Sequence, residues 1–368
     1  MQASVTDGRR VALTGATGFT GRLTARALME RGIEPVLIGR DRGKLEALAT
    51  ELGHGLAVRV VDDRTPQTWA DGLGDAHVVV ATAGPFVTVG EPALAFAARN
   101  GRRYVDCTGE QSFVRLAIAR YQATAEASGA CLLPSCGFES AMGVWAASLA
   151  ASELGGDEPI DAIDVVYATR GFGTSAGTRE SALRVAAADG VARVGGVLVD
   201  ERPASRWKEI DVEGRRVRAG CFPGVEALVV PRHVKVRDVR SHLAMGRRAG
   251  RVSRIAVPLL RGAPPALVEL AARLAKRGGS PETAPREGAR FVVVAEARRG
   301  RDCVRATITG TDPYGLTAAL LAEAALALGA IADARARGLA GVVSPSEVLA
   351  PTETIARLGR FELRATVG

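Results

Sequence analysis

Cysteine and histidine are scarce in this chain, and their scarcity excludes several classes of protein. The 368 residues include five cysteines and four histidines, without a Cys-x-x-Cys pair or any spacing typical of metal ligands. A small, odd number of cysteines is typical of proteins from a reducing compartment. We therefore expect a cytoplasmic protein with no metal site and no disulfide framework.

Long apolar runs are missing as well. No run approaches the ~20 residues that a membrane-spanning helix needs. The first ten residues are largely polar, and Val11 begins a run typical of a strand rather than the apolar region of a secretory signal. The sequence thus predicts neither a membrane span nor a signal peptide.

Positive charge is in excess, and much of it is arginine. The formal net charge of +8 favours anionic partners, such as a phosphorylated cofactor, a CoA thioester or an acidic carrier protein. The charge alone also permits nucleic acid, but no motif that reads nucleic acid is present, so we expect none. The sequence leaves the oligomeric state open, with a homodimer as one candidate.

The most informative segment is an apolar run followed by regularly spaced glycines. Val11–Thr14 is β-prone, three glycines follow with the spacing G-x-x-G-x-x-G, and Arg22–Arg31 is amphipathic. Such a strand, turn and helix hold a dinucleotide pyrophosphate on the free N–H groups of the helix N-terminus. The glycines allow the tight turn, the approach of the phosphates and the close packing of the helix. The predicted cofactor-binding residues here are Gly15, Thr17, Gly18, Phe19, Thr20 and Gly21.

The end of the second predicted strand distinguishes between cofactors. NAD-binding sheets place an Asp or Glu at this position for the ribose hydroxyls. This chain has Arg40 directly after the strand, and a guanidinium suits the 2′-phosphate of NADP. Asp41 comes one position late and is expected to cap a helix over Arg42–Leu52. We therefore predict NADP, the alternative being that Arg40 and Arg42 are ordinary surface charges.

The first third of the chain alternates short apolar strands with helices, which predicts a doubly wound parallel sheet. The expected helices include Pro92–Asn100 and Phe113–Ser128. The expected strands are Val11–Thr14, Val36–Gly39, Ala57–Val61, Val78–Thr82, Tyr104–Asp106 and Cys131–Pro134.

After Phe138 the pattern changes to an α+β domain with longer strands and a mainly antiparallel sheet. We expect a Rossmann domain over residues 1–138, a substrate domain over 139–311 and a helical return over 312–368 that packs on the first domain. In the middle domain the pattern predicts a helix at Ala141–Glu153, a strand at Asp161–Thr169 and a helix near Arg179–Asp189. Strands at Phe291–Ala297 and Cys303–Gly310 follow, and a helix at Gly315–Gly329 begins the return.

Several segments follow the order and residue pattern of one enzyme family. They are Thr14–Gly21, Gly39–Arg40, Ala83–Phe86 with Gly90 and Pro92, Tyr104–Glu110, Cys136–Ser140, Asp312–Ala318 and Gly341–Pro345. With them the chain resembles the saccharopine dehydrogenase-like reductases, and within these the trans-acting enoyl reductases of lipid and polyketide assembly. The resemblance implies a Rossmann domain with an inserted substrate domain. Residues 200–300 are less recognisable, and we expect substrate choice to reside there.

Two further segments are expected to border the cofactor. Ala83, Gly84, Pro85 and Phe86 follow the fourth strand, near the switch point where such sheets bind ligands. Asp106, Thr108 and Gly109 follow the fifth strand on the same edge. The resemblance favours polar groups near the nicotinamide for the second segment, although Asp106 and Glu110 are equally plausible as helix caps.

Substrate contacts are expected from the hinge and from a glycine-rich loop. Cys136 and Glu139 follow the sixth strand; Cys136 is either a reactive thiol or a small apolar filler. Gly171–Arg179 is either a flexible helix cap or a substrate-binding loop. The loop residues that we single out are Ser175, Thr178 and Arg179. Arg254–Lys276 either accepts an acyl chain and an acidic carrier or is an amphipathic surface helix.

Two phenols are candidate proton donors. Tyr314 starts the returning helix and is either a general acid or a packing anchor, and Tyr104 is the second candidate. The expected activity is NADPH-dependent reduction of an activated double bond, with the C=C bond of an enoyl thioester implied by the resemblance. The alternatives are an imine reductase of the saccharopine dehydrogenase type and a non-catalytic NADP-binding sensor or scaffold.

Overall fold

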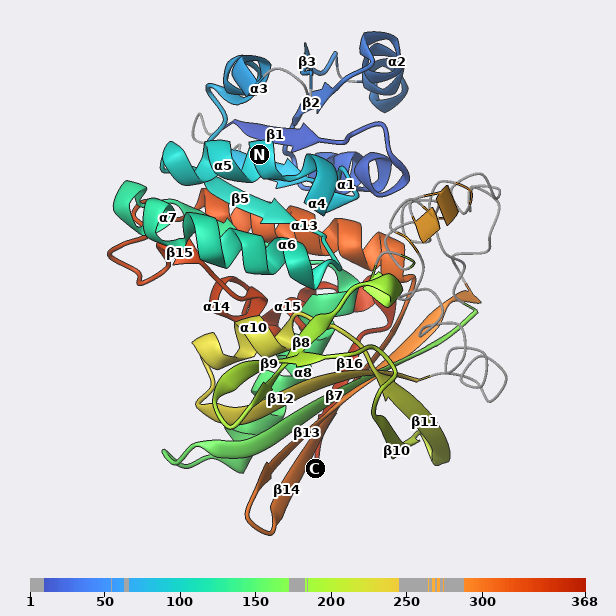
Figure 1. Ribbon diagram of the computed structural model, residues 1–368. Helices are drawn as coiled ribbons and strands as arrows, with labels where there is room; N and C mark the ends of the chain where they lie inside the picture. The colour runs from blue at the N-terminus through green and yellow to red at the C-terminus, as the bar shows by residue number, and fades with distance from the viewer. Residues whose placement is uncertain are drawn as a thin grey trace. The chain divides into compact units, whose positions relative to one another are not determined.

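The computed structural model describes residues 10–53, 55–62, 66–171, 183, 185–244, 264, 267–268, 270–271, 274 and 288–368 (Figure 1). They form two compact units. The first consists of Met1–Thr108, Phe113–Phe138 and Tyr314–Leu349. The second consists of Gly109–Ser112, Glu139–Pro313 and Ala350–Gly368.

The first unit contains a seven-stranded parallel sheet in the order β15-β6-β5-β4-β1-β2-β3. Six of its strands have the 3-2-1-4-5-6 order of dinucleotide-binding folds, so the predicted doubly wound parallel sheet is confirmed. The strands are β1 (Val11–Thr14), β2 (Val36–Gly39), β3 (Val58–Val60), β4 (Val78–Ala81), β5 (Arg103–Asp106), β6 (Cys131–Leu133) and β15 (Gly341–Val342).

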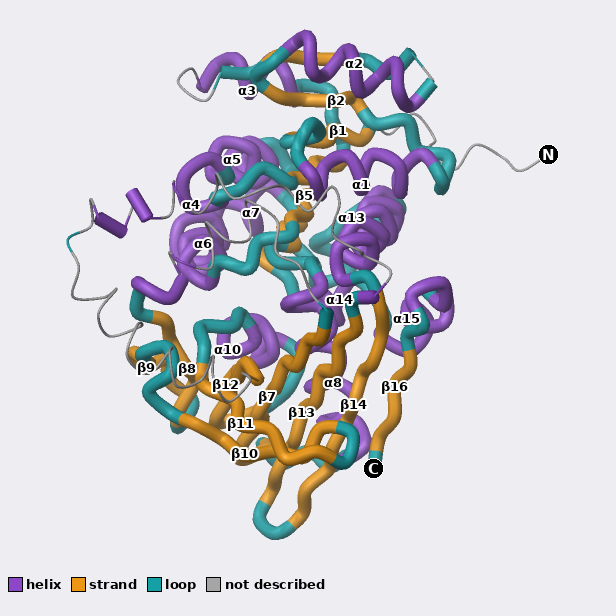
Figure 2. The backbone as a smooth tube through the Cα atoms, turned by 90° about the vertical axis from the view of Figure 1, so that its right-hand side faces the viewer, coloured by secondary structure: helices purple, strands orange, loops and turns teal. Residues whose placement is uncertain are grey.

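Helices cover both faces of this sheet. Figure 2 shows α3, α5 and α7 on one face and α1 and α13 on the other. The helices are α1 (Phe19–Met29), α2 (Arg42–Leu52), α3 (Pro66–Leu73), α4 (Phe86–Val89), α5 (Glu91–Arg99), α6 (Gln111–Leu116), α7 (Gln122–Ser128), α13 (Pro313–Gly329) and α14 (Pro345–Val348), with a π-helical turn at Ala117–Tyr121. Because both faces are covered, the strands are largely apolar, and β1 and β4 are buried throughout.

The second unit is built on a nine-stranded mixed sheet in which β12 and β7 run parallel and the other neighbours antiparallel. The predicted mainly antiparallel sheet is therefore confirmed. Its main path is β10-β11-β12-β7-β13-β14-β16, and β8 joins β12 to β9. The strands are β7 (Ile160–Arg170), β8 (Gly190–Val194), β9 (Val197–Glu201), β10 (Trp207–Val212), β11 (Arg215–Cys221), β12 (Val236–Ala244), β13 (Arg290–Arg299), β14 (Asp302–Thr311) and β16 (Arg364–Val367).

The two faces of this sheet have different neighbours. On β7, Tyr167 points to the face on which α8 (Phe138–Leu154) packs, since a Cβ on Gly143 of α8 would meet its hydroxyl. Val166 points to the opposite face and packs with Ile210 and Val212 of the β10–β11 hairpin. Short helices complete the unit at α10 (Glu226–Val229), η2 (Val230–Arg232), α15 (Pro351–Arg357) and η5 (Gly359–Phe361).

The C-terminal segment expected over residues 312–368 is shared between the units. Tyr314–Leu349 joins the first unit, and Ala350–Gly368 joins the second, where β16 pairs with β14. In the described part of the chain, no helix has the length and apolar character needed to cross a membrane. Part of the helix expected near Arg179–Asp189 and most of Arg254–Lys276 lie outside the described residues.

Candidate functional site

The glycine-rich turn joins β1 to α1 in a form that requires glycine. Gly15 has a φ of +72°, and a Cβ there would lie 2.6 Å from the backbone nitrogen of Ala83. A Cβ on Gly21 would lie 2.1 Å from the carbonyl oxygen of Gly15. The turn is therefore closed against its own helix and against the segment that follows β4.

The N-terminus of α1 has the properties of an anion site. Gly18 is the N-cap, with an extended backbone and no side chain to cap the helix. The first turn contains Phe19 and Thr20 and no acidic residue. The first N–H groups of a helix have no partner within the helix, and the helix dipole favours negative charge beside them. The turn thus fits the pyrophosphate of a dinucleotide.

The segment after β4 lies directly beside this turn. The close approach of Ala83 to Gly15 brings together two of the predicted cofactor segments at the β1–β4 switch point. Gly84 is exposed, and Pro85 is the N-cap of α4 after a cis peptide bond. The Phe86 ring is buried and packs against Phe113, with ring centroids 5.6 Å apart. Ala83 and Gly84 are thus the residues of this segment that suit contact with a ligand, whereas the side chain of Phe86 belongs to the core.

The end of β2 has one exposed arginine and one capping carboxylate. Asp41 accepts a hydrogen bond of 3.1 Å from the backbone N–H of Lys44, so the predicted helix cap is confirmed. This N–H group lowers the pKa of Asp41. Arg42 pairs with Glu46 at 3.4 Å, while Arg40 is exposed directly after the strand. Asp41 therefore serves as the helix cap, and the residue directly after the strand is the cationic Arg40.

Asp106 ties together the loops that follow β5 and β6. Its buried carboxylate accepts 2.8 Å hydrogen bonds from the Tyr104 hydroxyl and from the backbone N–H groups of Thr108 and Ser135. Burial and the Asp106 carboxylate raise the pKa of Tyr104 well above its ordinary value. Tyr104 is fully buried, and the partner of its hydroxyl is the Asp106 carboxylate.

Cys136 and Glu139 have contrasting environments. Cys136 is buried, its backbone N–H donates to the Asp106 carbonyl at 2.7 Å, and burial raises the pKa of its thiol. Glu139 is exposed in the first turn of α8, where a Cβ on Gly109 would lie 3.3 Å from its Oε1 atom. The predicted cofactor residue Gly109 and the predicted substrate residue Glu139 are thus neighbours.

Tyr314 lies at the phosphate turn. Its ring stands edge-on to the ring of Phe19, the first residue of α1, with centroids 5.0 Å apart. One turn further along α13, Thr317 accepts a 3.0 Å hydrogen bond from the backbone N–H of Phe138. Phe19 and Tyr314 were both predicted site residues, but no contact between them was predicted from the sequence. The other predicted substrate residues, Ser175, Thr178 and Arg179, lie outside the described residues.

A buried carboxyl in the second unit was missed by the sequence analysis. Glu226 is fully buried and accepts hydrogen bonds from the hydroxyls of Tyr167 and Ser241, the latter at 2.6 Å. Burial raises its pKa. A Cβ on Gly143 would lie 2.4 Å from one of its carboxyl oxygens and a Cβ on Gly224 2.3 Å from the other. Its burial could have been predicted from the sequence, because Glu226 is the one acidic residue in the apolar run from Val225 to Val230.

Part of the chain is similar in sequence to known proteins. No protein-family model matches the chain. A putative trans-acting enoyl reductase of Mycobacterium tuberculosis is 37% identical over 183 residues, 48% of this chain and 43% of that protein. The trans-acting enoyl reductase of Mycobacterium leprae is 38% identical over 135 residues, 35% of this chain and 32% of that protein. The matches thus span less than half the length of these curated relatives.

A solved structure extends the comparison to the whole fold. Apo saccharopine dehydrogenase (L-Glu forming) from Saccharomyces cerevisiae superposes with a TM-score of 0.64, covering 98% of this chain and 100% of that one. At 11% identity this likeness concerns the fold alone. The resemblance predicted from the sequence, to saccharopine dehydrogenase-like proteins and to trans-acting enoyl reductases, is confirmed.

Proposed function

We propose that this protein is an NADPH-dependent reductase that acts on the C=C bond of an enoyl thioester. The observation that carries the proposal is the closed glycine turn at the N-terminus of α1, with the phenol of Tyr314 beside it. The turn supplies a site for a dinucleotide, and a phenol is a plausible general acid for a reduction.

The cofactor would be held by elements of the first unit. The N–H groups at the start of α1 bind the pyrophosphate, with Gly15, Thr17, Gly18, Phe19, Thr20 and Gly21 forming the turn. Arg40 faces the 2′-phosphate, which makes the protein selective for NADPH. Ala83 and Gly84 form a wall without large side chains. When bound, the nicotinamide supplies a hydride to the substrate.

The protein's own part in the reaction is orientation and proton supply. Tyr314 donates a proton from its hydroxyl to the carbon or oxygen that becomes basic as the hydride is transferred. Asp106 holds Thr108 and Ser135 in place by its hydrogen bonds, and so shapes the loops that follow β5 and β6. Tyr104 stays the second candidate for the proton donor. Cys136, Glu139, Ser175, Thr178 and Arg179 are proposed to contact the substrate.

The substrate class rests on the relatives. The two mycobacterial proteins are named trans-acting enoyl reductases, which favours a C=C bond conjugated to a carbonyl. The net charge of +8 favours a substrate that carries phosphate or is presented by an acidic carrier protein.

Titration and a substrate screen test the proposal. NADPH and NADH are titrated into the protein, and oxidation of the better-bound cofactor is followed with an enoyl-CoA and with a cyclic imine. We expect tight binding of NADPH and turnover with the enoyl thioester. Turnover with the imine alone would assign the reaction to C=N bonds. Cofactor binding without turnover on either substrate would favour a sensor or scaffold.

A further inference from the structure

One face of the second unit's sheet carries a regular ladder of cross-strand pairs between β7 and β13. These pairs, all on the face that also carries the β10–β11 hairpin, are Arg170 with Arg290, Ala168 with Val292, Val166 with Val294, Asp164 with Glu296, and Ala162 with Arg298. The middle of the ladder is apolar, and a pair of like charges lies toward each end. Each charged pair joins two residues of the same sign, an arrangement that destabilises a sheet unless a counter-charge lies between them.

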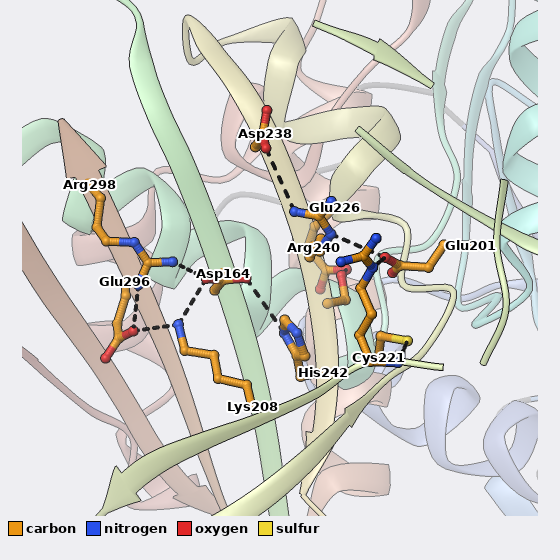
Figure 3. Close-up of polar contacts among 12 residues, drawn as sticks. Asp164, Glu201, Lys208, Cys221, Glu226, Asp238, Arg240, His242, Glu296 and Arg298 are labelled. Carbon is orange, nitrogen blue, oxygen red and sulfur yellow. Dashed lines mark hydrogen bonds and ion pairs between the residues drawn. The ribbon is translucent and has the colours of Figure 1, made fainter. Parts of the chain in front are cut away.

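The acidic pair shows how this sheet accommodates like charges. Figure 3 shows the ammonium of Lys208 between the two carboxylates, 2.8 Å from Asp164 and 2.6 Å from Glu296. Arg298 pairs with both carboxylates, and Arg305 lies 2.7 Å from Glu296. Nearby cations, Lys208 above all, lower the pKa of Asp164 and Glu296 against the opposing effect of burial. A bridging ion of opposite charge thus stabilises this end of the ladder.

The basic pair at the other end has no such bridge among the residues that the structure describes. Arg290 has one carboxylate partner, Glu362, at 3.7 Å, and its side chain is 72% exposed. Arg170 is exposed and has no ion pair within the described part of the chain. Arg364 of β16 lies opposite Thr309, on the same face, and is also exposed without an ion pair among the described residues. Within the described part of the chain, three guanidinium groups therefore share this end of the face with one carboxylate.

The arginine side chains indicate which kind of anion could bridge Arg170 and Arg290. Two arginines directly opposite each other on a sheet have their Cβ atoms about 5 Å apart, so one anion can reach both guanidinium forks. Arginine forks match the oxygens of phosphate and bind it in bidentate fashion. A phosphate group carries more charge than a carboxylate and can accept from both forks at once.

We propose that Arg170 and Arg290, supported by Arg364, bind the phosphate of the pantetheine arm that carries the acyl substrate. The inference rests on the proposed function, because it assigns the anion to the thioester substrate. Arg170 lies about 20 Å along the strand from Asp164, at the usual rise per residue, so the site is separate from the Lys208 network. The same end of the sheet leads through Asp312 into α13, which begins with Pro313 and Tyr314.

The test compares thioesters with and without the phosphate. Michaelis constants are measured for Arg170→Gln, Arg290→Gln and the double variant with an enoyl-CoA, with the same acyl group on a carrier protein, and with its pantetheine thioester, which lacks phosphate. Arg216→Gln is the matched control, since it removes an exposed arginine from β11 of the same sheet. We expect KM for the two phosphate-bearing substrates to rise about tenfold for each arginine, in the range of a charged hydrogen bond, with kcat unchanged. KM for the pantetheine thioester and all values for the control should stay unchanged.

Three results would overturn the inference. These are equal changes with and without the phosphate, no change with any substrate, and a change with the CoA thioester alone, which would assign the arginines to the nucleotide end of CoA. A binding experiment keeps the inference separate from the proposed function. Phosphopantetheine is titrated calorimetrically into the protein saturated with NADPH, which occupies the cofactor site. Binding that is lost in the double variant supports the inference even if no thioester is reduced, and absent or unchanged binding contradicts it.

Discussion

The ring of Tyr314 stands at 89° to the ring of Phe19, with their centroids 5.0 Å apart. One residue starts the helix that returns near the C-terminus, and the other starts the helix that follows the phosphate turn. An edge-to-face contact fixes the position of the phenol without using its hydroxyl. The ring contact therefore anchors the side chain of Tyr314 independently of its hydroxyl.

The first prediction separates these two roles of Tyr314. Tyr314→Phe keeps the ring contact and removes the hydroxyl, so single-turnover hydride transfer should slow by ~10²–10⁴-fold with cofactor affinity preserved. Phe19→Leu is the matched variant, because it removes the ring contact and keeps the hydroxyl. It should lower thermal stability and affect the rate much less. A Tyr314→Phe variant that loses only stability would assign the residue to packing.

The second prediction concerns Tyr104. Tyr104→Phe removes the hydroxyl that donates a hydrogen bond to Asp106, so it should lower the free energy of unfolding by about 0.5–1.5 kcal/mol and leave the rate near that of the wild type. Tyr121→Phe is the control, since it removes a hydroxyl that donates to Glu91 at 2.8 Å in the same unit. If the rate falls in Tyr104→Phe as far as expected for Tyr314→Phe, the proton reaches the substrate through Tyr104 and Asp106 instead.

The third prediction concerns the phosphate turn. Gly18→Val places a branched side chain where the pyrophosphate approaches, so it should abolish cofactor binding and leave the fold largely intact. Gly43→Val, in the first turn of α2, makes the same change where a Cβ meets nothing closer than 3.6 Å. Calorimetric titration of both variants, with circular dichroism to confirm folding, gives the answer. Normal cofactor affinity in a folded Gly18→Val variant would exclude this turn as the phosphate site.

The fourth prediction concerns cofactor selectivity. Arg40→Asp should weaken NADPH binding by about 1–3 kcal/mol and leave NADH binding unchanged or improved. Arg42→Asp makes the same change of charge two residues away, where the arginine pairs with Glu46, and should change the ratio of the two affinities little. The dissociation constants of both cofactors are measured for each variant. Equal affinity of the wild-type protein for NADPH and NADH would show that Arg40 does not select the 2′-phosphate.

The fifth prediction concerns the buried carboxyl of Glu226. Because burial raises its pKa in the folded protein, folding takes up a proton between the unfolded and folded pKa values. The stabilisation is fully present below the unfolded pKa and is lost as pH rises through the folded pKa. Glu226→Gln cannot titrate, so its stability relative to the wild type should improve as the pH rises above the ordinary pKa of a glutamate. Urea unfolding at several pH values measures this difference, and a constant or opposite difference would contradict a raised pKa.

Local patterns predicted the first unit well. The predicted bounds agree with the structure for the strands Val11–Thr14 and Val36–Gly39 and for the helix Arg42–Leu52. Strands buried on both faces are largely apolar, so their extent can be seen in the sequence. The start of the helix could be predicted because Asp41 is a strong cap. The glycine spacing predicted the turn because the steric limits that demand glycine depend on the local backbone. Gly15 and Gly21 have the crowded surroundings that such a turn requires.

Pairings between distant segments were beyond local patterns. The Arg170–Arg290 pair depends on the register of two strands separated by more than a hundred residues, and nothing near either arginine encodes that register. The strand β16, Arg364–Val367, is exposed at every position. Its sequence therefore lacks the alternation of apolar and polar residues from which a strand can be predicted. Glu226 is buried because Gly143 and Gly224 leave room for its carboxyl, which follows from packing rather than from its neighbours in sequence.

In the proposed reaction, hydride passes from NADPH to an enoyl thioester on this protein. NADPH carrying deuterium at the transferred position is incubated with the protein and an enoyl-CoA, and the product is analysed by mass spectrometry and NMR. We expect a saturated thioester with one deuterium on the carbon β to the carbonyl when the wild-type protein is used. With Gly18→Val this product should not form. An unreduced thioester, or a reduced product without deuterium at that carbon, would contradict it.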